Sequence, residues 1–586
     1  MKRKKLLAAL LSIAMLATTV AGCGDAKPAT DTPATNNTTA TTADGTNETA
    51  TSYDEMLTID VYDGAANYQG VQIGWFAKVI KDKFNMELNI IAPQVAGDAI
   101  FQTRASTGNL GDIVLIDRTD YADCVKTGLI KDITDKFASS TNLQEYKKQI
   151  DTYNQSLEDN AEGKIYGIPC QMTNTSPTSY SQDVVGSSPL LRWDLYAELG
   201  CPEIADLDGL LDVLKQMMDA HPTNAEGDPA YPFSLWPDWD NNDNMIGIAN
   251  AAQLTTWYGE KIKGSAILKP DNTFVPLTDK TASYYKMVKF LNKANNMGLV
   301  DPDSGTQDWN AACAKMSAGQ VYLMWYNWQV GFWNSQERLT DGTGFIFIPV
   351  KDQTYYADSD TYFGADRVIG VGSQVEGEKY DRIIAFLDWY ASPEGLMFQH
   401  DGIEGFNYTK DDKGVLTAIN SDALMNNLPV PEEWGGAGYQ DGNNAINQWI
   451  VDAISTNPLT GEPYSTQYWS TWKAATMTDM KKAWQVKFGA EEPVDYMKNN
   501  NVLLVSPSVS VQITSDSSDM SVIRNQCGET VKEYSWKMVF AKDDAKFDAL
   551  WDEMSTKLDG FGFQDLVKFD EERYQVQVDA KIAAAK

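Results

Sequence analysis

Histidine is nearly missing from this sequence, and the shortage excludes several kinds of active site. Only two histidines occur in 586 residues, His221 and His400, and they lie far apart in the chain. A histidine-rich metal centre or a Ser-His-Asp triad therefore has too few residues to draw on. The sequence also lacks a phosphate-binding loop, a nucleophile elbow and zinc-like Cys/His spacing. We therefore predict no metal site, no cofactor and no enzyme of these classes.

Cysteine and positive charge are also scarce. The chain has six cysteines, and they are too widely scattered to predict a disulfide framework. The 48 Lys and Arg residues stand against 81 Asp and Glu, for a net charge of −33. This balance argues against nucleic acid as a partner. It also disfavours polyanionic ligands, although a local basic pocket could override the average.

The one long apolar run, Leu6–Val20, follows the basic residues Lys2–Lys5. It is too short to span a membrane comfortably and is typical of a secretory signal. The run ends at Val20-Ala21-Gly22-Cys23, which resembles the lipobox of bacterial lipoproteins. The resemblance implies a signal peptide over residues 1–22 and a lipidated Cys23 that anchors the protein to the extracellular face of the cell membrane. We expect residues 23–52, rich in Thr, Ala and Asn, to form a disordered tether.

A strand–helix–strand pattern opens the rest of the chain. Residues 57–61 alternate like a strand, residues 70–84 carry apolar side chains at helical spacing, and residues 88–91 return to a strand pattern. Such a unit predicts a parallel sheet and an α/β fold. The remaining chain, roughly 530 residues, exceeds what one core usually supports, so we expect two lobes.

A series of segments follows one another in a characteristic order and spacing. They are Gly111–Ile116, Gly128–Thr134, Gly163–Pro169, Leu191–Tyr196, Gly298–Pro302, Gly319–Met324, Phe345–Pro349, Gly402–Tyr408 and Val531–Tyr574. In this order and spacing, residues 53–586 resemble family 1 extracellular solute-binding proteins, the lipoprotein components of carbohydrate ABC transporters, and in particular their larger members.

The resemblance implies a type 2 periplasmic-binding-protein fold: two α/β lobes joined by a hinge, with the ligand held in the cleft between them. We expect the first lobe to comprise residues 53–170 and 341–430. The second, richer in helices, is expected to comprise residues 171–340 and 431–586. Residues 345–349 are expected as the strand that returns to the first lobe.

Candidate ligand contacts follow from the chemistry of sugars, whose apolar faces suit aromatic rings and whose hydroxyl groups suit planar polar side chains. Three loops combine these residue types, near positions 236–244, 325–334 and 431–441. Other candidates lie at strand ends or at the expected crossing between lobes. The predicted contacts are Trp236, Trp239, Asp240, Trp325, Asn327, Trp328, Trp333, Trp434 and Tyr439 from the loops, with Trp75, Asp117, Arg118, Arg367 and Glu404.

Each of these residues has a plainer alternative. The aromatic side chains could fill the core, and Arg367 could form a surface ion pair. Glu404 could tie a glycine-rich turn. Because Trp333 lies further along the chain than Trp325 and Trp328, it is the weaker candidate of the three.

These observations favour a monomeric, lipid-anchored binding protein that captures a neutral oligosaccharide and delivers it to an ABC permease. The alternatives are a surface glycoside hydrolase, which needs only two carboxylates, and a peptide-binding receptor on a similar scaffold.

Overall fold

A computed structural model describes residues 53–97, 99–158, 160, 162–240, 247–248, 250–424, 426–511 and 513–586. The predicted signal peptide, lipidated Cys23 and tether lie outside these residues. No helix in the described part of the chain combines the length and apolar character that a membrane crossing needs.

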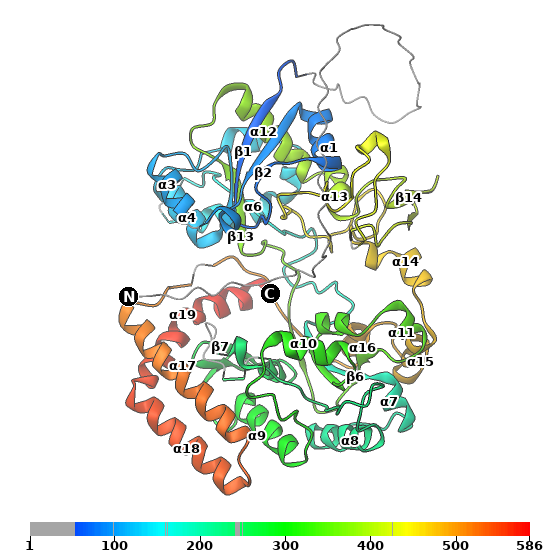
Figure 1. The fold of residues 1–586 in the computed structure, drawn as a ribbon. Helices are drawn as coiled ribbons and strands as arrows, with labels where there is room; N and C mark the ends of the chain where they lie inside the picture. Colours follow the sequence, from blue (N-terminus) through cyan, green and yellow to red (C-terminus); the bar gives the residue numbers. More distant parts are fainter. Residues whose placement is uncertain are drawn as a thin grey trace, which may run out of the picture. The chain divides into compact units, whose positions relative to one another are not determined.

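The first sheet has six strands in the order β2-β3-β1-β4-β13-β5. Strands β1 (Leu57–Asp63), β3 (Met86–Ile91) and β4 (Ile113–Asp117) are parallel, and β13 (Arg367–Val371) runs antiparallel beside β4. Helix α1 (Gly74–Phe84) lies between the parallel strands β1 and β3 in the chain, so the predicted strand–helix–strand unit is confirmed (Figure 1). Residues 70–71, expected in the helix, instead form the short strand β2. The carboxyl ends of β1 and β4 therefore meet at one edge of the sheet.

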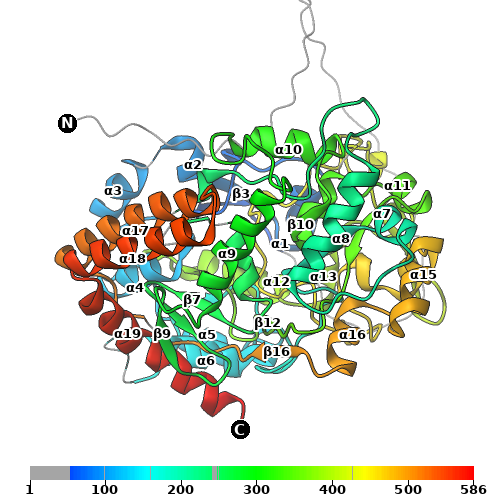
Figure 2. The same ribbon diagram turned by 90° about the horizontal axis from the view of Figure 1, so that it is seen from below.

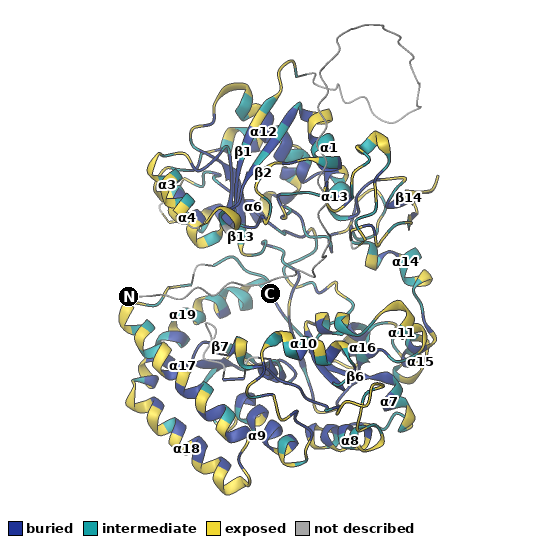
Figure 3. Ribbon diagram, viewed as in Figure 1, coloured by how far each residue is buried: buried dark blue, intermediate teal, exposed yellow. Residues whose placement is uncertain are grey.

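Both faces of this sheet are covered, which explains why its strands read as continuous apolar runs. Along β4, Ile113 and Leu115 pack into the apolar cluster that contains α1 and α12 (Gly377–Tyr390). The alternate residues Val114 and Ile116 pack on the other face, against helices α4 (Arg118–Lys126) and α6 (Lys147–Gln155). Figure 3 shows the buried strands of this sheet between helices whose outer surfaces are exposed.

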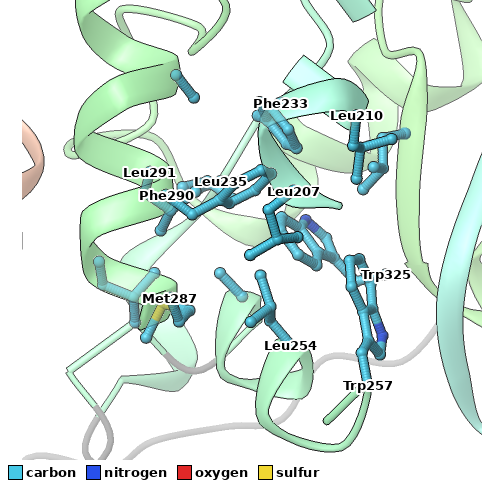
Figure 4. Close-up of a cluster of buried hydrophobic side chains, with 14 of the residues drawn as sticks. Leu207, Leu210, Phe233, Leu235, Leu254, Trp257, Met287, Phe290, Leu291 and Trp325 are labelled. Carbon is cyan, nitrogen blue, oxygen red and sulfur yellow. The ribbon is translucent and has the colours of Figure 1, made fainter. Parts of the chain in front are cut away.

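The second sheet places β6 (Ser187–Arg192) between β10 (Leu323–Tyr326) and β11 (Phe345–Phe347), both antiparallel to it. It belongs to a separate apolar cluster. That cluster also holds residues of helices α8 (Leu207–Ala220) and α9 (Ser283–Asn296) and of the C-terminal helices α17 (Ser518–Val539), α18 (Asp544–Gly560) and α19 (Phe563–Ala584). Figure 4 shows part of this cluster, with Trp257 and Trp325 among the leucine side chains. Figure 2 shows the C-terminal helices α17 and α18 running side by side, in agreement with their packing.

The remaining elements connect or cover these two sheets. The helices are α2 (Pro93–Ala96), α3 (Ala99–Ser106), α4 (Arg118–Lys126), α5 (Thr134–Ala138), α6 (Lys147–Gln155), α7 (Trp193–Glu198), α8 (Leu207–Ala220), α9 (Ser283–Asn296), α10 (Trp309–Ser317), α11 (Gln336–Thr340), α13 (Pro393–His400), α14 (Ser470–Ala475), α15 (Asp479–Phe488), α16 (Pro493–Asn499), α17 (Ser518–Val539), α18 (Asp544–Gly560) and α19 (Phe563–Ala584). The strands are β2 (Gly70–Val71), β5 (Ile168–Pro169), β7 (Lys261–Lys263), β8 (Ala266–Leu268), β9 (Phe274–Pro276), β12 (Tyr355–Asp358), β14 (Tyr408–Lys410), β15 (Leu416–Ala418) and β16 (Leu503–Ser506).

The packing divides the chain differently from the expected boundaries in two places. Residues 345–349 were expected to return to the first lobe, but Phe345–Phe347 pair with β6 and pack with the second sheet. Residues 439–469, expected in the second lobe, contribute Tyr439, Ile450 and Trp469 to the cluster around α1 and α12. The reason is that the chain returns to the first sheet only at β13. It then leaves the cluster around α1 and α12 only after α14 begins.

A buried ion network ties the C-terminal helices to the second sheet's cluster. Asp570 of α19 is fully buried and accepts hydrogen bonds from both terminal nitrogens of Arg524, at 2.7 and 2.8 Å. The same carboxylate accepts the backbone N–H and the hydroxyl of Ser265, each at 2.7 Å. Arg573 and Asp516 complete the network, with an ion pair of 2.9 Å between them. Each buried charge therefore has a partner, as burial requires.

Candidate functional site

Six aromatic side chains, which we call the aromatic cluster, gather near the end of β10. They are Trp236, Trp239, Trp309, Tyr326, Trp328 and Phe332. The ring of Trp309 lies 4.6 Å from that of Trp236 and 4.7 Å from that of Trp239, measured between centroids. Trp328 lies 6.0 Å from Trp239. Trp236 is fully buried, whereas Trp328 is 46% exposed, so the cluster has a packed base and an open aromatic surface.

Local hydrogen bonds hold these rings in place. The turn after β10 is closed by the buried side chain of Gln329, whose Oε1 accepts the backbone N–H groups of Trp325 and Tyr326 at 2.8 and 3.1 Å. The carboxylate of Asp238 accepts the backbone N–H of Trp309 at 2.8 Å, which joins the 236–240 loop to the start of α10. Such support gives a fixed aromatic surface rather than a mobile one.

The cluster therefore unites two of the predicted loops. It brings Trp239 and Trp328 together, and the sequence reasoning missed Trp309, which completes the surface. Asn327 is partly buried beside Trp328, and its backbone N–H donates to the carbonyl of Gly186 at 3.1 Å. Trp309 lies between acidic and small residues at the start of a helix, so its own segment gave no signal for a ligand contact.

Other predicted contacts in these loops are packing residues in this structure. Trp325 is 2% exposed, and its ring stacks on Phe233 and Trp257 at centroid distances of 5.7 and 5.3 Å (Figure 4). Asp240 is 5% exposed, and its Oδ2 accepts the indole N–H of Trp536 at 2.6 Å, which joins its loop to α17.

Trp333 packs away from the aromatic cluster. The guanidinium groups of Arg192 and Arg338 contact its ring, at 4.5 and 3.5 Å from the ring centroid. Its indole N–H donates to the carbonyl of Thr343 at 2.6 Å. These packing contacts agree with the expectation that Trp333 is a weaker candidate ligand contact than Trp328.

Polar side chains gather at the carboxyl-terminal edge of the first sheet. Asp117 ends β4 and lies opposite Arg367 in the β4–β13 ladder, with 3.4 Å between Oδ1 and Nε. Both side chains are partly exposed, at 66% and 37%. The Arg367 Nη1 also donates to Oε1 of Gln448 at 3.4 Å. Carboxylate, guanidinium and amide groups are the types that pair with sugar hydroxyls.

Asp63, at the end of β1, joins this edge and was missed by the sequence reasoning. Its side chain is fully buried, and Oδ1 accepts the backbone N–H groups of Ala65 and Ala66 at 2.7 and 3.1 Å. Its Oδ2 has no hydrogen-bond partner among the described residues. Burial raises the pKa of this carboxyl group to about 7, against the opposing effects of the two N–H groups and of Arg367.

We expect Asp63→Asn to stabilise the fold increasingly as the pH rises. Unfolded Asp63 loses its proton near its ordinary pKa of 3.8, whereas the folded carboxyl group keeps its proton up to about 7. The wild-type protein therefore loses this residue's contribution to stability as the pH rises across that interval, and asparagine has no proton to lose. Urea midpoints of both proteins at several pH values measure the difference. A difference that stays constant across the pH range would contradict the assignment.

Arg118 supports a crossing between the two apolar clusters. Its guanidinium donates to the carbonyls of Phe363 and Ala365, each at 2.6 Å, and to the hydroxyl of Ser510 at 3.2 Å. It also lies 5.1 Å from the ring centroid of Tyr153. Burial lowers the pKa of this guanidinium from its ordinary value. These contacts make Arg118 a residue that positions the crossing segment.

The third predicted loop is divided between core and surface. Trp75 is fully buried, its ring stacks on Tyr439 at 5.1 Å, and its indole N–H donates to the carbonyl of Tyr439 at 2.9 Å. Next to Trp75, a Cβ added to Gly74 would lie 2.3 Å from the Cα of Gly442, so glycine is needed for this close approach. Trp434 is partly buried, with its ring 5.9 Å from that of Phe398.

Glu404 is exposed in the turn that precedes β14.

The described residues contain no group of three or more His, Cys, Asp or Glu side chains placed to hold a metal ion.

Residues 71–397 match the family model described as bacterial extracellular solute-binding protein. No curated protein matches the chain.

Three solved structures share the fold with this chain. One is the alginate-binding protein AlgQ2 without calcium ion, at 15% identity and a TM-score of 0.54, covering 90% of this chain and 100% of that one. Another is the FusA substrate-binding protein of S. pneumoniae in complex with kestose, at 15% identity and a TM-score of 0.54, covering 89% and 100%. The third is an HMO-binding, ABC-transporter-associated solute-binding protein from Bifidobacterium longum infantis ATCC 15697, at 16% identity and a TM-score of 0.56, covering 90% and 100%. The predicted two-lobed α/β fold is thereby confirmed.

Proposed function

Because the chain belongs to the bacterial extracellular solute-binding protein family, we propose that it captures an oligosaccharide and delivers it to the permease of an ABC transporter. The observation that carries this proposal is the aromatic cluster, in which the half-exposed ring of Trp328 is supported by Trp239 and Trp309. Such rings can cover the apolar faces of sugars. The descriptions of the three fold relatives name alginate, kestose and HMO as what those proteins bind. The net charge of −33 favours a neutral ligand here.

The ligand in this proposal is held between two lobes. The chain passes from one apolar cluster to the other between Met172 and Tyr180, between Ala357 and Val368, and between Trp472 and Met480. We propose these three segments as the hinge. The aromatic cluster is then the wall contributed by the second lobe, and the edge formed by Asp117 and Arg367 is the wall contributed by the first. Closure on the ligand produces the form that the permease recognises.

We propose that the protein acts as a monomer tethered through a lipidated Cys23. Residues 24–52 contain no large apolar residue, and a flexible chain of about 29 residues has an end-to-end distance of about 30 Å. The binding unit would therefore stay close to the membrane surface. Mass spectrometry of the membrane-associated protein tests whether Cys23 carries lipid.

A calorimetric screen of residues 53–586 against neutral oligosaccharides of graded length tests the main proposal. We expect stoichiometric binding without products, checked by chromatography of the incubated sugar. Catalytic turnover would identify a glycoside hydrolase instead. Binding of peptides with none of glycans would identify a peptide receptor.

A further inference from the structure

A polar cavity of about 280 Å³ lies away from the aromatic cluster and shares no lining residue with it. It is lined by residues from the end of α13, the turn before β14, positions 420–424 and 439–443, and the start of α14. Its lining includes Gln399, His400, Asp401, Asn407, Tyr439 and Trp472. Figure 1 labels α13, β14 and α14.

Asp401 is the acidic side chain of this cavity, and only one of its two carboxyl oxygens has a hydrogen-bond partner. The residue is 7% exposed. Its Oδ1 accepts the hydroxyl of Thr466 at 2.7 Å, whereas its Oδ2 has no hydrogen-bond partner in the described part of the chain. A buried carboxylate oxygen without a donor is costly, and a bound group that donates hydrogen bonds would offset that cost.

Two neighbouring side chains also present acceptors. Gln399 uses its amide nitrogen to donate to the carbonyls of Tyr390 and Gly395, at 2.7 and 2.8 Å, and its Oε1 has no partner among the described residues. His400 places Nε2 3.0 Å from the carbonyl of Val451, so Nε2 carries the proton. The Nδ1 of a neutral imidazole is then an acceptor. The side chains of three consecutive lining residues, Gln399, His400 and Asp401, therefore offer hydrogen-bond acceptors rather than donors.

The lining also fixes the sign of charge that the cavity favours. Lysine and arginine are missing from its described lining and burial lowers the pKa of His400, so the carboxylate of Asp401, once it is ionised, is the only formal charge of that lining. The partly buried indole of Trp472 adds an aromatic face, which attracts cations. An anion would meet a carboxylate and no positive group, whereas a cation with N–H donors would satisfy both the charge and the acceptors.

We propose that this cavity is a second ligand site, which binds a small protonated amine through Asp401, Gln399 and His400, with Trp472 covering the apolar part of the ligand. The site is independent of the proposed oligosaccharide surface.

The protonation of Asp401 makes the proposed binding depend on pH. Burial raises the pKa of the free carboxyl group to about 8. The other titratable groups that interact with it are the tyrosines Tyr408, Tyr439 and Tyr464, whose pKa values burial also raises, and the adjacent His400, whose pKa burial lowers to about 4. These groups stay neutral between about pH 6 and pH 8. A cation pairs with the ionised carboxylate, so the affinity should rise roughly tenfold per pH unit up to about pH 8 and then level off.

Calorimetry with putrescine as the probe, and 1,4-butanediol as its neutral analogue of equal length, tests the proposal on residues 53–586. We expect putrescine to bind, the diol to bind at least tenfold more weakly, and Asp401→Asn to lose at least tenfold in putrescine affinity. The matched control is Glu433→Gln, which removes the same charge from an exposed position and should bind as the wild type does. Trp328→Ala should also leave putrescine binding unchanged.

Several outcomes would overturn the proposal. Equal binding of the diol would show that hydroxyl donors suffice, and unchanged binding by Asp401→Asn would place the amine elsewhere on this acidic protein. No binding of putrescine at any pH would leave a cavity that holds water only. The pH profile of the wild type needs no variant, so the test survives even if Asp401→Asn unfolds.

Discussion

Replacing Trp328 with alanine should lower the affinity for the transported oligosaccharide at least tenfold and leave the fold intact. The side chain is 46% exposed at the open surface of the aromatic cluster, where its ring can stack on a sugar. A tenfold change in affinity corresponds to about 1.4 kcal/mol, within reach of one lost stacking contact. The ring also touches Tyr326 and Trp239, at 5.2 and 6.0 Å, so we expect a small loss of stability, about 1 kcal/mol.

Calorimetric titration of the variant with the oligosaccharide found in the screen measures this effect. Phe561→Ala is a suitable control, because Phe561 is also a partly exposed aromatic residue, at 38%, but lies after α18. Equal affinity of Trp328→Ala and wild type would show that the aromatic cluster is not the binding surface. The fold and the family would still stand in that case, and the search for the site would move to the polar edge of the first sheet.

The elements of the first sheet were predictable because their signals are local. Apolar alternation in β1 and helical spacing in α1 reflect which faces are buried, and the connection between parallel strands requires a crossing helix. The boundaries between clusters were not predictable in the same way. Whether Phe345–Phe347 pairs with β6 or returns to the first sheet depends on a partner more than a hundred positions away, and both alternatives suit an apolar strand.

The candidate site shows the same contrast. The density of tryptophan pointed to loops whose rings come together, since Trp328 and Trp239 share one surface. Their contact with a ligand stays a prediction. That density could not distinguish Trp328 from Trp325, because both are large aromatic residues in one short stretch and only the cover provided by Phe233 and Trp257 makes the latter a core residue. Asp63 gave no signal either. An aspartate after a strand is ordinary in sequence, and its burial depends on the chain that covers the sheet edge.

Trp325→Ala should have the opposite consequence to Trp328→Ala: a large loss of stability with little specific loss of affinity. The ring of Trp325 stacks between those of Phe233 and Trp257, and the residue is 2% exposed. Truncating a buried tryptophan to alanine costs about 3–5 kcal/mol, because the packing contacts are lost and a cavity remains. The hydroxyl of Ser187 donates to the carbonyl of Trp325 at 2.7 Å and accepts the indole N–H of Trp257 at 2.9 Å, so the loosened packing should also weaken the link between β10 and β6.

Urea unfolding followed by far-ultraviolet circular dichroism measures the loss without relying on tryptophan fluorescence, which the substitution itself changes. We expect the midpoint to fall clearly, and the fraction that remains folded to bind the oligosaccharide with nearly the wild-type affinity. Trp325→Phe, which keeps an aromatic ring between Phe233 and Trp257, should recover most of the stability. A stable Trp325→Ala protein that has lost oligosaccharide binding would instead place this ring at the ligand, in a conformation more open than the one described. The pair of variants therefore separates two roles within one aromatic stretch: the buried ring of Trp325 packs the core, and the exposed ring of Trp328 is the one that we propose as the sugar contact.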